Sequence, residues 1–321
     1  MITDEDIEFH PFPDNQASIW AETNYFPFFL PDSGLSGAIY NVFRPGLGVC
    51  LSDVTIFDHC SNHWEGLAYI DNQQHLPCPD SLTKYSLNNG VSVQSHKNIR
   101  HYQFEYQGID QTSFEATFTG LMPPYEIKKP KKSSQQKDDG WIKSFGGHFD
   151  LTGHVSGQLT LRGQRHDIDC LATMDHSWGP RAERDNGSAT FFQAHFGDDL
   201  SINAFLVLDP ADLTQSGPLL NGYVMDRKSV TSLESASARI QRSGIFPDYF
   251  EVTLQDKNGL VYNLCGRFLT WAPWAPFSST IYYQGLTEFK LNGQTGFGAY
   301  QEVISRAAIT RHKLSIGSVR S

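Results

Sequence analysis

The densest group of reactive side chains in the sequence is the run Asp175-His176-Ser177-Trp178-Gly179-Pro180-Arg181. A carboxyl group held against an indole loses hydration, which raises its pKa and lets it act as a general acid near neutral pH. Asp175 beside Trp178 therefore indicates proton donation, and the indole face can stabilise a nearby cation. His176 can relay a proton or orient the acid. Arg181 can bind an oxyanion, or hold Asp175 ionised and so oppose the acid role.

The same residue types also suit a purely structural corner of the fold. Asp and Ser cap turns, Trp fills a core, and Arg pairs with Asp across a tight turn. The residue types alone leave the catalytic and the structural interpretation open.

A strand must position this run, because apolar and polar residues alternate before it. One face of the expected strand is apolar and typical of a core, with Ile168, Cys170, Ala172 and Met174. The other face carries Asp167, Asp169, Leu171, Thr173 and Asp175. We therefore expect Asp175 at the end of the strand, opposite the core face, and a turn at Gly179-Pro180.

Similar alternation around turn residues predicts antiparallel hairpins elsewhere in the chain. The expected strand pairs are 102–106 with 113–119, 155–161 with 167–173, 189–196 with 201–208, and 249–254 with 260–264. Aromatic residues, which favour pleated surfaces, make up 13% of the chain. These patterns predict an all-β protein built from antiparallel barrels or strongly curved sheets.

The length of 321 residues suits two domains. The polar segment 128–140, KKPKKSSQQKDDG, predicts an exposed loop or linker near the midpoint. We therefore place a boundary just after it and expect domains at residues 1–145 and 146–321.

Composition excludes several classes of partner. Lys and Arg number 25 against 35 Asp and Glu, a net charge of −10, which disfavours nucleic acid and anionic membranes. The sequence has neither an apolar run long enough for a transmembrane helix nor the pattern of a signal peptide. Five scattered cysteines do not predict a disulfide framework. We expect a cytoplasmic protein with a hydrophobic small-molecule ligand; its oligomeric state stays open.

Two further groups of residues have both a functional and a structural interpretation. His59 and His63 are four positions apart, which places both side chains on one face for metal binding only if they lie on a helix. Histidines elsewhere in the chain, including His195, could supply further ligands of a zinc site. Hydrogen-bonded structural histidines are the alternative, so we assign no metal and no cofactor. Trp271 and Trp274, interleaved with prolines, predict either a rigid packed loop or an aromatic lid over a pocket.

The segment from Gly147 to Arg181 resembles the centre of a bacterial branch of the AttH and carotenoid 1,2-hydratase (hydroxyneurosporene synthase) group. The mark of that branch is Asp-His-x-Trp/Tyr-Gly after a strand, matched at Asp175, His176, Trp178 and Gly179. Weaker likenesses are Trp20-Ala-Glu22-Thr-Asn-Tyr25-Phe26, with Gly34 and Gly37, near the start and Gly296-Phe-Gly298 with Glu302 near the end. The resemblance implies two lipocalin-like β-domains.

The resemblance also implies cofactor-free chemistry on a largely hydrocarbon, terpenoid-like or aromatic substrate. Its leading form is a hydratase or dehydratase in which Asp175 protonates an alkene, assisted by His176 and Trp178. The alternatives are an isomerase or pericyclase-like cyclase in the same pocket, and a carrier without catalysis. The expected substrate-binding residues are Trp20, Glu22, Tyr25, His148, His154, Arg181, His195, Trp271 and Trp274.

Overall fold

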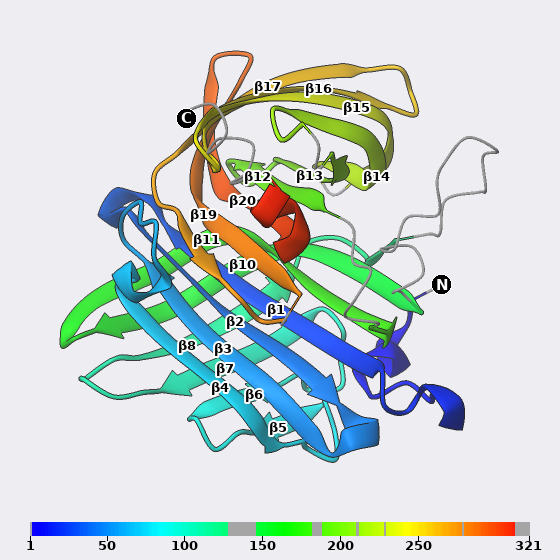
Figure 1. The fold of residues 1–321 in the computed structure, drawn as a ribbon, viewed down its shortest axis with the longest axis vertical. Helices are drawn as coiled ribbons and strands as arrows, with labels where there is room; N and C mark the ends of the chain where they lie inside the picture. The colour runs from blue at the N-terminus through cyan, green and yellow to red at the C-terminus, as the bar shows by residue number, and fades with distance from the viewer. Residues whose placement is uncertain are drawn as a thin grey trace. The chain divides into compact units, whose positions relative to one another are not determined.

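The computed structural model describes residues 2–127, 146–181, 188–209, 212–227, 229–277 and 279–311 (Figure 1). Strands dominate these residues, and adjacent strands pair antiparallel. The short helices are η1 (Asp4–Ile7), η2 (Asp14–Gln16), η3 (Pro31–Ser33), η4 (Pro45–Leu47) and η5 (Trp64–Gly66), and residues 306–311 are helical. Within the described ranges, no helix is long and apolar enough to cross a membrane.

The chain divides into two compact units, and the first comprises residues 2–58, 67–127 and 146–181 of the described chain. Its strands form one strongly curled sheet, a half-barrel, in the order β4-β3-β2-β1-β11-β10-β8-β7-β6-β5, with β9 on β10. The bounds are β1 (Trp20–Leu30), β2 (Leu35–Arg44), β3 (Val49–Phe57), β4 (Tyr69–Pro77), β5 (Lys84–Ser86), β6 (Val91–Gln94), β7 (His101–Gln107), β8 (Ser113–Gly120), β9 (Tyr125–Glu126), β10 (Gly147–Leu161) and β11 (Gln164–Pro180).

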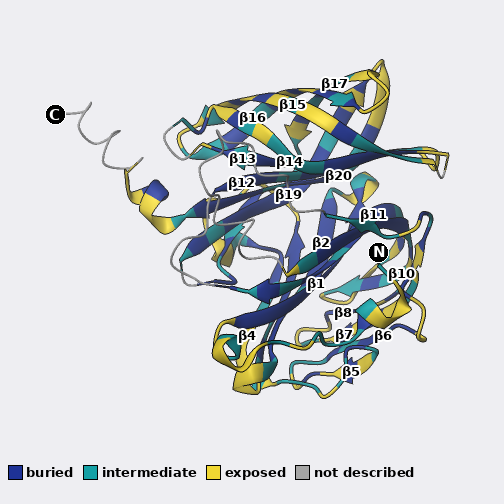
Figure 2. Ribbon diagram, turned by 90° about the vertical axis from the view of Figure 1, so that its right-hand side faces the viewer, coloured by how far each residue is buried: buried dark blue, intermediate teal, exposed yellow. Residues whose placement is uncertain are grey.

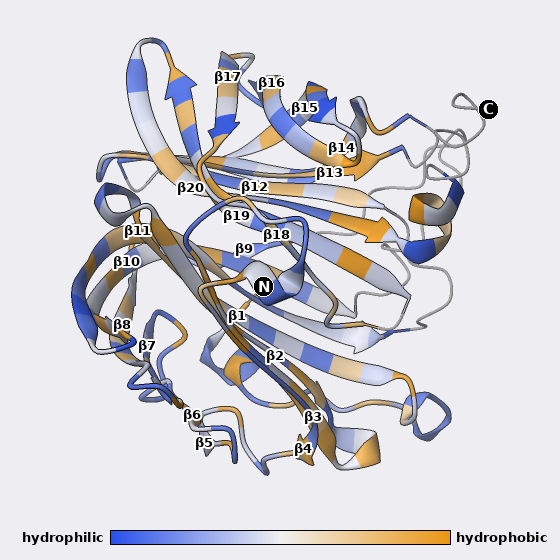
Figure 3. Cartoon of the chain, turned by 60° about the vertical axis from the view of Figure 1, so that its left-hand side comes forward, coloured by the Kyte–Doolittle hydropathy of each residue, from blue (hydrophilic) through white to orange (hydrophobic). Residues whose placement is uncertain are grey.

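Alternation of side chains creates the core of this first unit. Along β7 every second residue is buried. Figure 2 colours the strands by burial, and hydrophobic and hydrophilic residues alternate along strands in Figure 3. The buried rings contact one another across strands, as in Phe26 with Phe104 at 5.2 Å and Phe28 with Phe114 at 5.2 Å between ring centroids.

The two end strands of this sheet are β4 and β5. The pairing of β4 with β3 contains a register shift, and His75 in β4 has a positive φ of 62°.

The second unit is a closed barrel of eight strands. The order β17-β16-β15-β14-β13-β12-β20-β19 closes because β17 also pairs with β19, and β18 adds to β19. The bounds are β12 (Ala189–Phe196), β13 (Leu200–Leu208), β14 (Gln215–Asp226), β15 (Ser229–Ser243), β16 (Phe246–Asp256), β17 (Val261–Phe268), β18 (Ala272–Trp274), β19 (Thr280–Leu291) and β20 (Gln294–Ser305). Its core includes Phe192, Phe250, Phe289 and Tyr300.

The structure confirms the all-β prediction and the four predicted hairpins, which correspond to β7–β8, β10–β11, β12–β13 and β16–β17. The boundary lies elsewhere than expected near residue 145. Strands β10 and β11 belong to the first unit, because β10 pairs with β8 and β11 pairs with β1. The polar segment 128–140, on which that boundary was based, lies outside the described residues.

Candidate functional site

The Asp-His-Ser-Trp run occupies the end of β11, between β1 and β10, and the regular pairing there separates its side chains. Asp175 lies opposite Tyr25 of β1 and Asp150 of β10. His176 lies opposite Asn24 and Phe149. Because consecutive strand residues point to opposite faces, Asp175 lies on one face and His176 on the other.

Asp175 shares its face with a histidine and a second carboxylate, both from β10. Nε2 of His148 is 3.1 Å from Oδ1 of Asp150 and 4.0 Å from Oδ1 of Asp175. His148 and Asp150 are buried, whereas the Asp175 side chain is 23% exposed. Burial raises the pKa of Asp175 to about 7; His148 and Arg181 act against this rise, and Asp150 adds to it. The arrangement therefore provides a carboxyl group that still holds its proton near neutral pH.

Hydroxyl groups and Arg181 fix the neighbourhood of Asp175. The hydroxyl groups of Thr23 and Ser177 are 2.7 Å apart, and Nη2 of Arg181 donates to Oγ of Ser177 at 2.8 Å. Tyr25 packs edge-on against Tyr40, with ring centroids 6.3 Å apart. The aromatic residue paired with Asp175 is therefore Tyr25, because Trp178 points to the opposite face.

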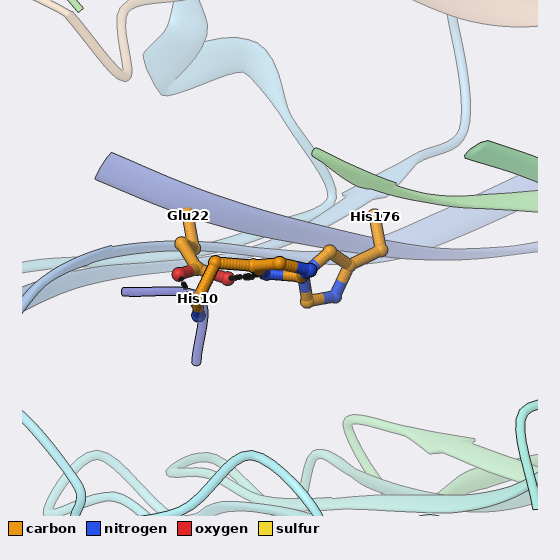
Figure 4. Close-up of side chains that lie close together, drawn as sticks. All are labelled: His10, Glu22 and His176. Carbon is orange, nitrogen blue, oxygen red and sulfur yellow. Dashed lines mark hydrogen bonds and ion pairs between the residues drawn. The ribbon is translucent and has the colours of Figure 1, made fainter. Parts of the chain in front are cut away.

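The other face of β11 carries a cluster centred on the fully buried Glu22 of β1 (Figure 4). Oε2 of Glu22 is 3.1 Å from Nδ1 of His10 and 3.2 Å from Nε2 of His176. Oε1 accepts the backbone N–H of His10 at 2.6 Å and the indole N–H of Trp20 at 3.3 Å. The Trp178 indole stacks on the His10 ring at 3.6 Å between centroids.

The ionisation of this cluster follows from its hydrogen bonds. Burial works to raise the pKa of Glu22, but the bonds from His10 and His176 outweigh it and lower the pKa to about 2. Burial likewise opposes protonation of His10, yet Glu22 and Asp6 raise its pKa overall. For His176 burial prevails and the pKa falls. The cluster therefore contains Glu22 as a carboxylate, beside one imidazole whose pKa is raised, His10, and one whose pKa is lowered, His176.

A family model described as Domain of unknown function (DUF7064) matches residues 3–304. The chain belongs to this family. Comparison of this DUF7064 member with the curated proteins found no match.

Solved structures share the fold of this DUF7064 member. Kievitone hydratase from Nectria haematococca matches with a TM-score of 0.56 at 13% identity, covering 91% of this chain and 90% of its own. A putative AttH protein from Nitrosomonas europaea matches with 0.59 at 13% identity, covering 89% and 91%. CghA matches with 0.56 at 10% identity, covering 90% and 88%. The resemblance to the AttH group is therefore confirmed, at the level of the fold.

Of the residues expected in the site of this DUF7064 member, the first unit brings two sets together. One face of β11 gathers Asp175, Tyr25, His148 and Arg181, and the other gathers His176, Trp178, Trp20 and Glu22. His154 joins neither set, because it is partly exposed and pairs with Asp169 at 2.6 Å.

The remaining expected residues belong to the second unit, where they pack in or beside the barrel. Burial lowers the pKa of His195 to about 3, and its ring bonds to Ser201 at 2.9 Å. Trp271 stacks on Tyr283 at 5.5 Å between centroids. Trp274 lies in β18, with its ring centroid 5.0 Å from that of Tyr282.

Three residues of the two clusters were missed from the sequence, and one of them had a signal. Asp150 follows His148 by two positions on an expected strand, which places both on one face. His10 and Asp6 lie before β1, in a segment without the periodic pattern of a strand or helix that would have predicted where their side chains point.

The candidate metal-ligand pair does not form, because His59 and His63 are exposed and share no helix. The potential metal-ligand group found among the described residues is His10, Glu22 and His176.

Proposed function

We propose that the protein is a lyase that adds water to, or removes it from, a carbon–carbon double bond of an apolar terpenoid-like or aromatic substrate. The observation that carries the proposal is the partly exposed Asp175 carboxyl group beside His148, which a second carboxylate, Asp150, orients. An acid with a pKa near the working pH is the kind that general acid catalysis needs, and such catalysis typically contributes about 10²–10⁴-fold.

In the hydration direction, Asp175 transfers its proton to one alkene carbon, and the positive charge develops on the other. Tyr25, the cross-strand partner of Asp175, offers an aromatic face to that cation. Water adds to the cationic carbon and gives one proton to His148. Nε2 of His148 is 4.0 Å from Oδ1 of Asp175, so one bridging water can carry a proton back to Asp175. The net reaction adds one water molecule to the alkene and returns Asp175 and His148 to their starting protonation states. Dehydration follows the same steps in reverse order.

The fold likeness supports the reaction class. One of the similar structures is, by its name, a hydratase of kievitone, and two-unit β-folds of this kind therefore accommodate hydration. The likeness concerns the fold, so the proposed chemistry depends on the Asp175, His148 and Asp150 geometry of this chain.

The test uses purified protein, kievitone and neurosporene as probe alkenes, and water enriched in oxygen-18. We expect a product heavier than the alkene by one labelled water, detected by mass spectrometry. Asp175→Asn should lower turnover by about 10²-fold or more, because the amide cannot donate an acidic proton. The matched control is Asp167→Asn, the same change at an exposed position on the same face of β11.

Two results would contradict the proposal. One is undiminished turnover by a folded Asp175→Asn protein. The other is an isomerised or unchanged alkene without oxygen-18, which would indicate a cyclase or a carrier instead.

A further inference from the structure

We propose that His10, Glu22 and His176 form a binding site for a divalent first-row transition-metal ion, with Zn²⁺ as the best-fitting ion. Each residue offers one ligand atom, and the three atoms lie within 4.8 Å of one another. Figure 4 shows both imidazole rings approaching the same carboxylate.

The distances between the ligand atoms suit a tetrahedral ion. Zn²⁺ binds imidazole nitrogen and carboxylate oxygen at about 2.0–2.2 Å, so neighbouring ligand atoms around it lie about 3.3–3.5 Å apart. Here Oε2 of Glu22 is 3.1 Å from His10 Nδ1 and 3.2 Å from His176 Nε2. An ion can therefore replace the two shared protons, with the two imidazole nitrogens, which lie within 4.8 Å of each other, adjusting to tetrahedral spacing.

Protein groups hold the atoms of His10 and Glu22 that would not touch the ion. Nε2 of His10 is 3.2 Å from Oδ1 of Asp6, the carboxylate–histidine arrangement typical of metal sites. Asp6 is fixed in turn by the backbone N–H of Thr3, at 2.7 Å from its Oδ2. Oε1 of Glu22 accepts from the His10 backbone and the Trp20 indole, which leaves Oε2 to face the two imidazoles.

The donor set indicates the class of ion. Two imidazoles and one carboxylate suit zinc and its first-row neighbours rather than Ca²⁺ or Mg²⁺, which prefer oxygen ligands. Three protein ligands leave a fourth position for water or a ligand atom. Glu22 is fully buried, but the His10 side chain is 16% exposed, so an ion can enter past His10.

This site is independent of the proposed hydration step. Its ligands lie on the face of β11 opposite Asp175, and no proton in that step passes through them. The site ties the segment before β1 to both β1 and β11.

The test uses full-length protein without an affinity tag, stripped with a chelator and titrated with Zn²⁺ by calorimetry. We expect one ion per chain. Titration with Co²⁺ should give visible absorption typical of four-coordinate nitrogen and oxygen ligation. His10→Gln should weaken binding by at least about 100-fold, and Asp6→Asn by about 10-fold or more, because it frees the ligand ring. The control His101→Gln changes a partly exposed histidine that bonds to Thr119, and should leave binding unchanged.

Three results would overturn the site. They are the absence of stoichiometric binding by the wild-type protein, full binding by His10→Gln, and loss of binding in a His59→Gln, His63→Gln double variant instead. Circular dichroism checks that each variant folds. Should His10→Gln fail to fold, Asp6→Asn decides, because its side chain touches only His10 and Thr3 in the bonds described, and unweakened binding by that variant would then refute the site.

Discussion

Asp175 makes the stability of the fold depend on pH in a direction unusual for an aspartate. Its pKa rises from 3.8 to about 7 on folding, because burial disfavours the charged form, so the folded protein binds the proton more tightly than the unfolded chain. The groups facing it are His148, Asp150 and Arg181. This contribution is fully present below pH 3.8 and is lost as the pH rises through about 7.

We therefore expect the wild-type protein to lose stability relative to Asp175→Asn between pH 5 and pH 8. A shift of about three pKa units corresponds to a change on the order of 4 kcal/mol, most of it within this window. Urea unfolding of both proteins at several pH values measures it. A difference in unfolding free energy that stays constant from pH 5 to pH 8 would show that Asp175 ionises as freely in the folded state as in the unfolded chain.

The sequence identified the reactive segment but grouped its side chains wrongly. Adjacency along the chain suggested Asp175 beside Trp178, whereas positions 175 and 178 lie on opposite faces of a regular strand. The alternation itself predicted that Asp175 faces away from Met174, and the structure bears this out. The partners of Glu22 were not predictable, because His176 is 154 residues away and His10 precedes the sheet.

At the scale of the elements, strand β10 needs a glycine at position 147, because the indole of Trp178 on the neighbouring strand β11 fills the space that a side chain would occupy. Gly147 pairs with Trp178, and a Cβ atom at Gly147 would lie 2.1 Å from Cζ2 of the indole. Gly147→Ala should displace the indole from the His10 ring and destabilise the fold by about 1–3 kcal/mol.

Urea unfolding with tryptophan fluorescence as the signal tests this change. The control is Gly217→Ala in β14, whose added Cβ would come no closer than 3.2 Å to its neighbours. Equal stability of the two variants would mean that the indole moves aside without cost.

The hairpins were predictable because the turn residues and the alternating strands that define each one are adjacent in the sequence. The turn Asp256-Lys257-Asn258-Gly259 joins β16 to β17, and Gly259 adopts the positive φ of 83° that such turns require. The division of the chain depends instead on the pairing of β1 with β11, far apart in sequence, for which no local pattern exists. A polar segment looks the same whether it joins two domains or two strands of one sheet.

At the scale of the whole molecule, a buried ion pair joins two strands of the barrel. Arg242 of β15 forms two bonds to Glu302 of β20, one of 3.0 Å, and donates to the carbonyl groups of Leu213 and Ile245 at 2.6 and 2.8 Å. Tyr300 also donates to Glu302, at 2.8 Å. Burial opposes the charge of Arg242, but Glu302 outweighs it and raises the pKa of Arg242.

Glu302→Gln should destabilise the barrel by about 3–5 kcal/mol, because it leaves a buried cation without its counter-ion. Glu288→Gln in β19 is the matched control. Its ion pairs, each 3.6 Å long, are with two exposed cations, Arg267 and Lys290, and their loss should cost less than about 1 kcal/mol. Hydrogen exchange of the barrel strands measures both. Equal protection in the two variants would contradict a stabilising role for the buried pair.

The half-barrel of the first unit, unlike the closed barrel, leaves two strands at the ends of its sheet. Such strands invite a second molecule to add its own strand, which is how aggregates and fibrils begin. β5 is only three residues long, and β4 has a shifted register, a positive φ at His75 and a proline at its end. An incoming strand therefore meets no long, regular row of hydrogen-bonding groups, and both ends of the open sheet are poor templates for intermolecular pairing.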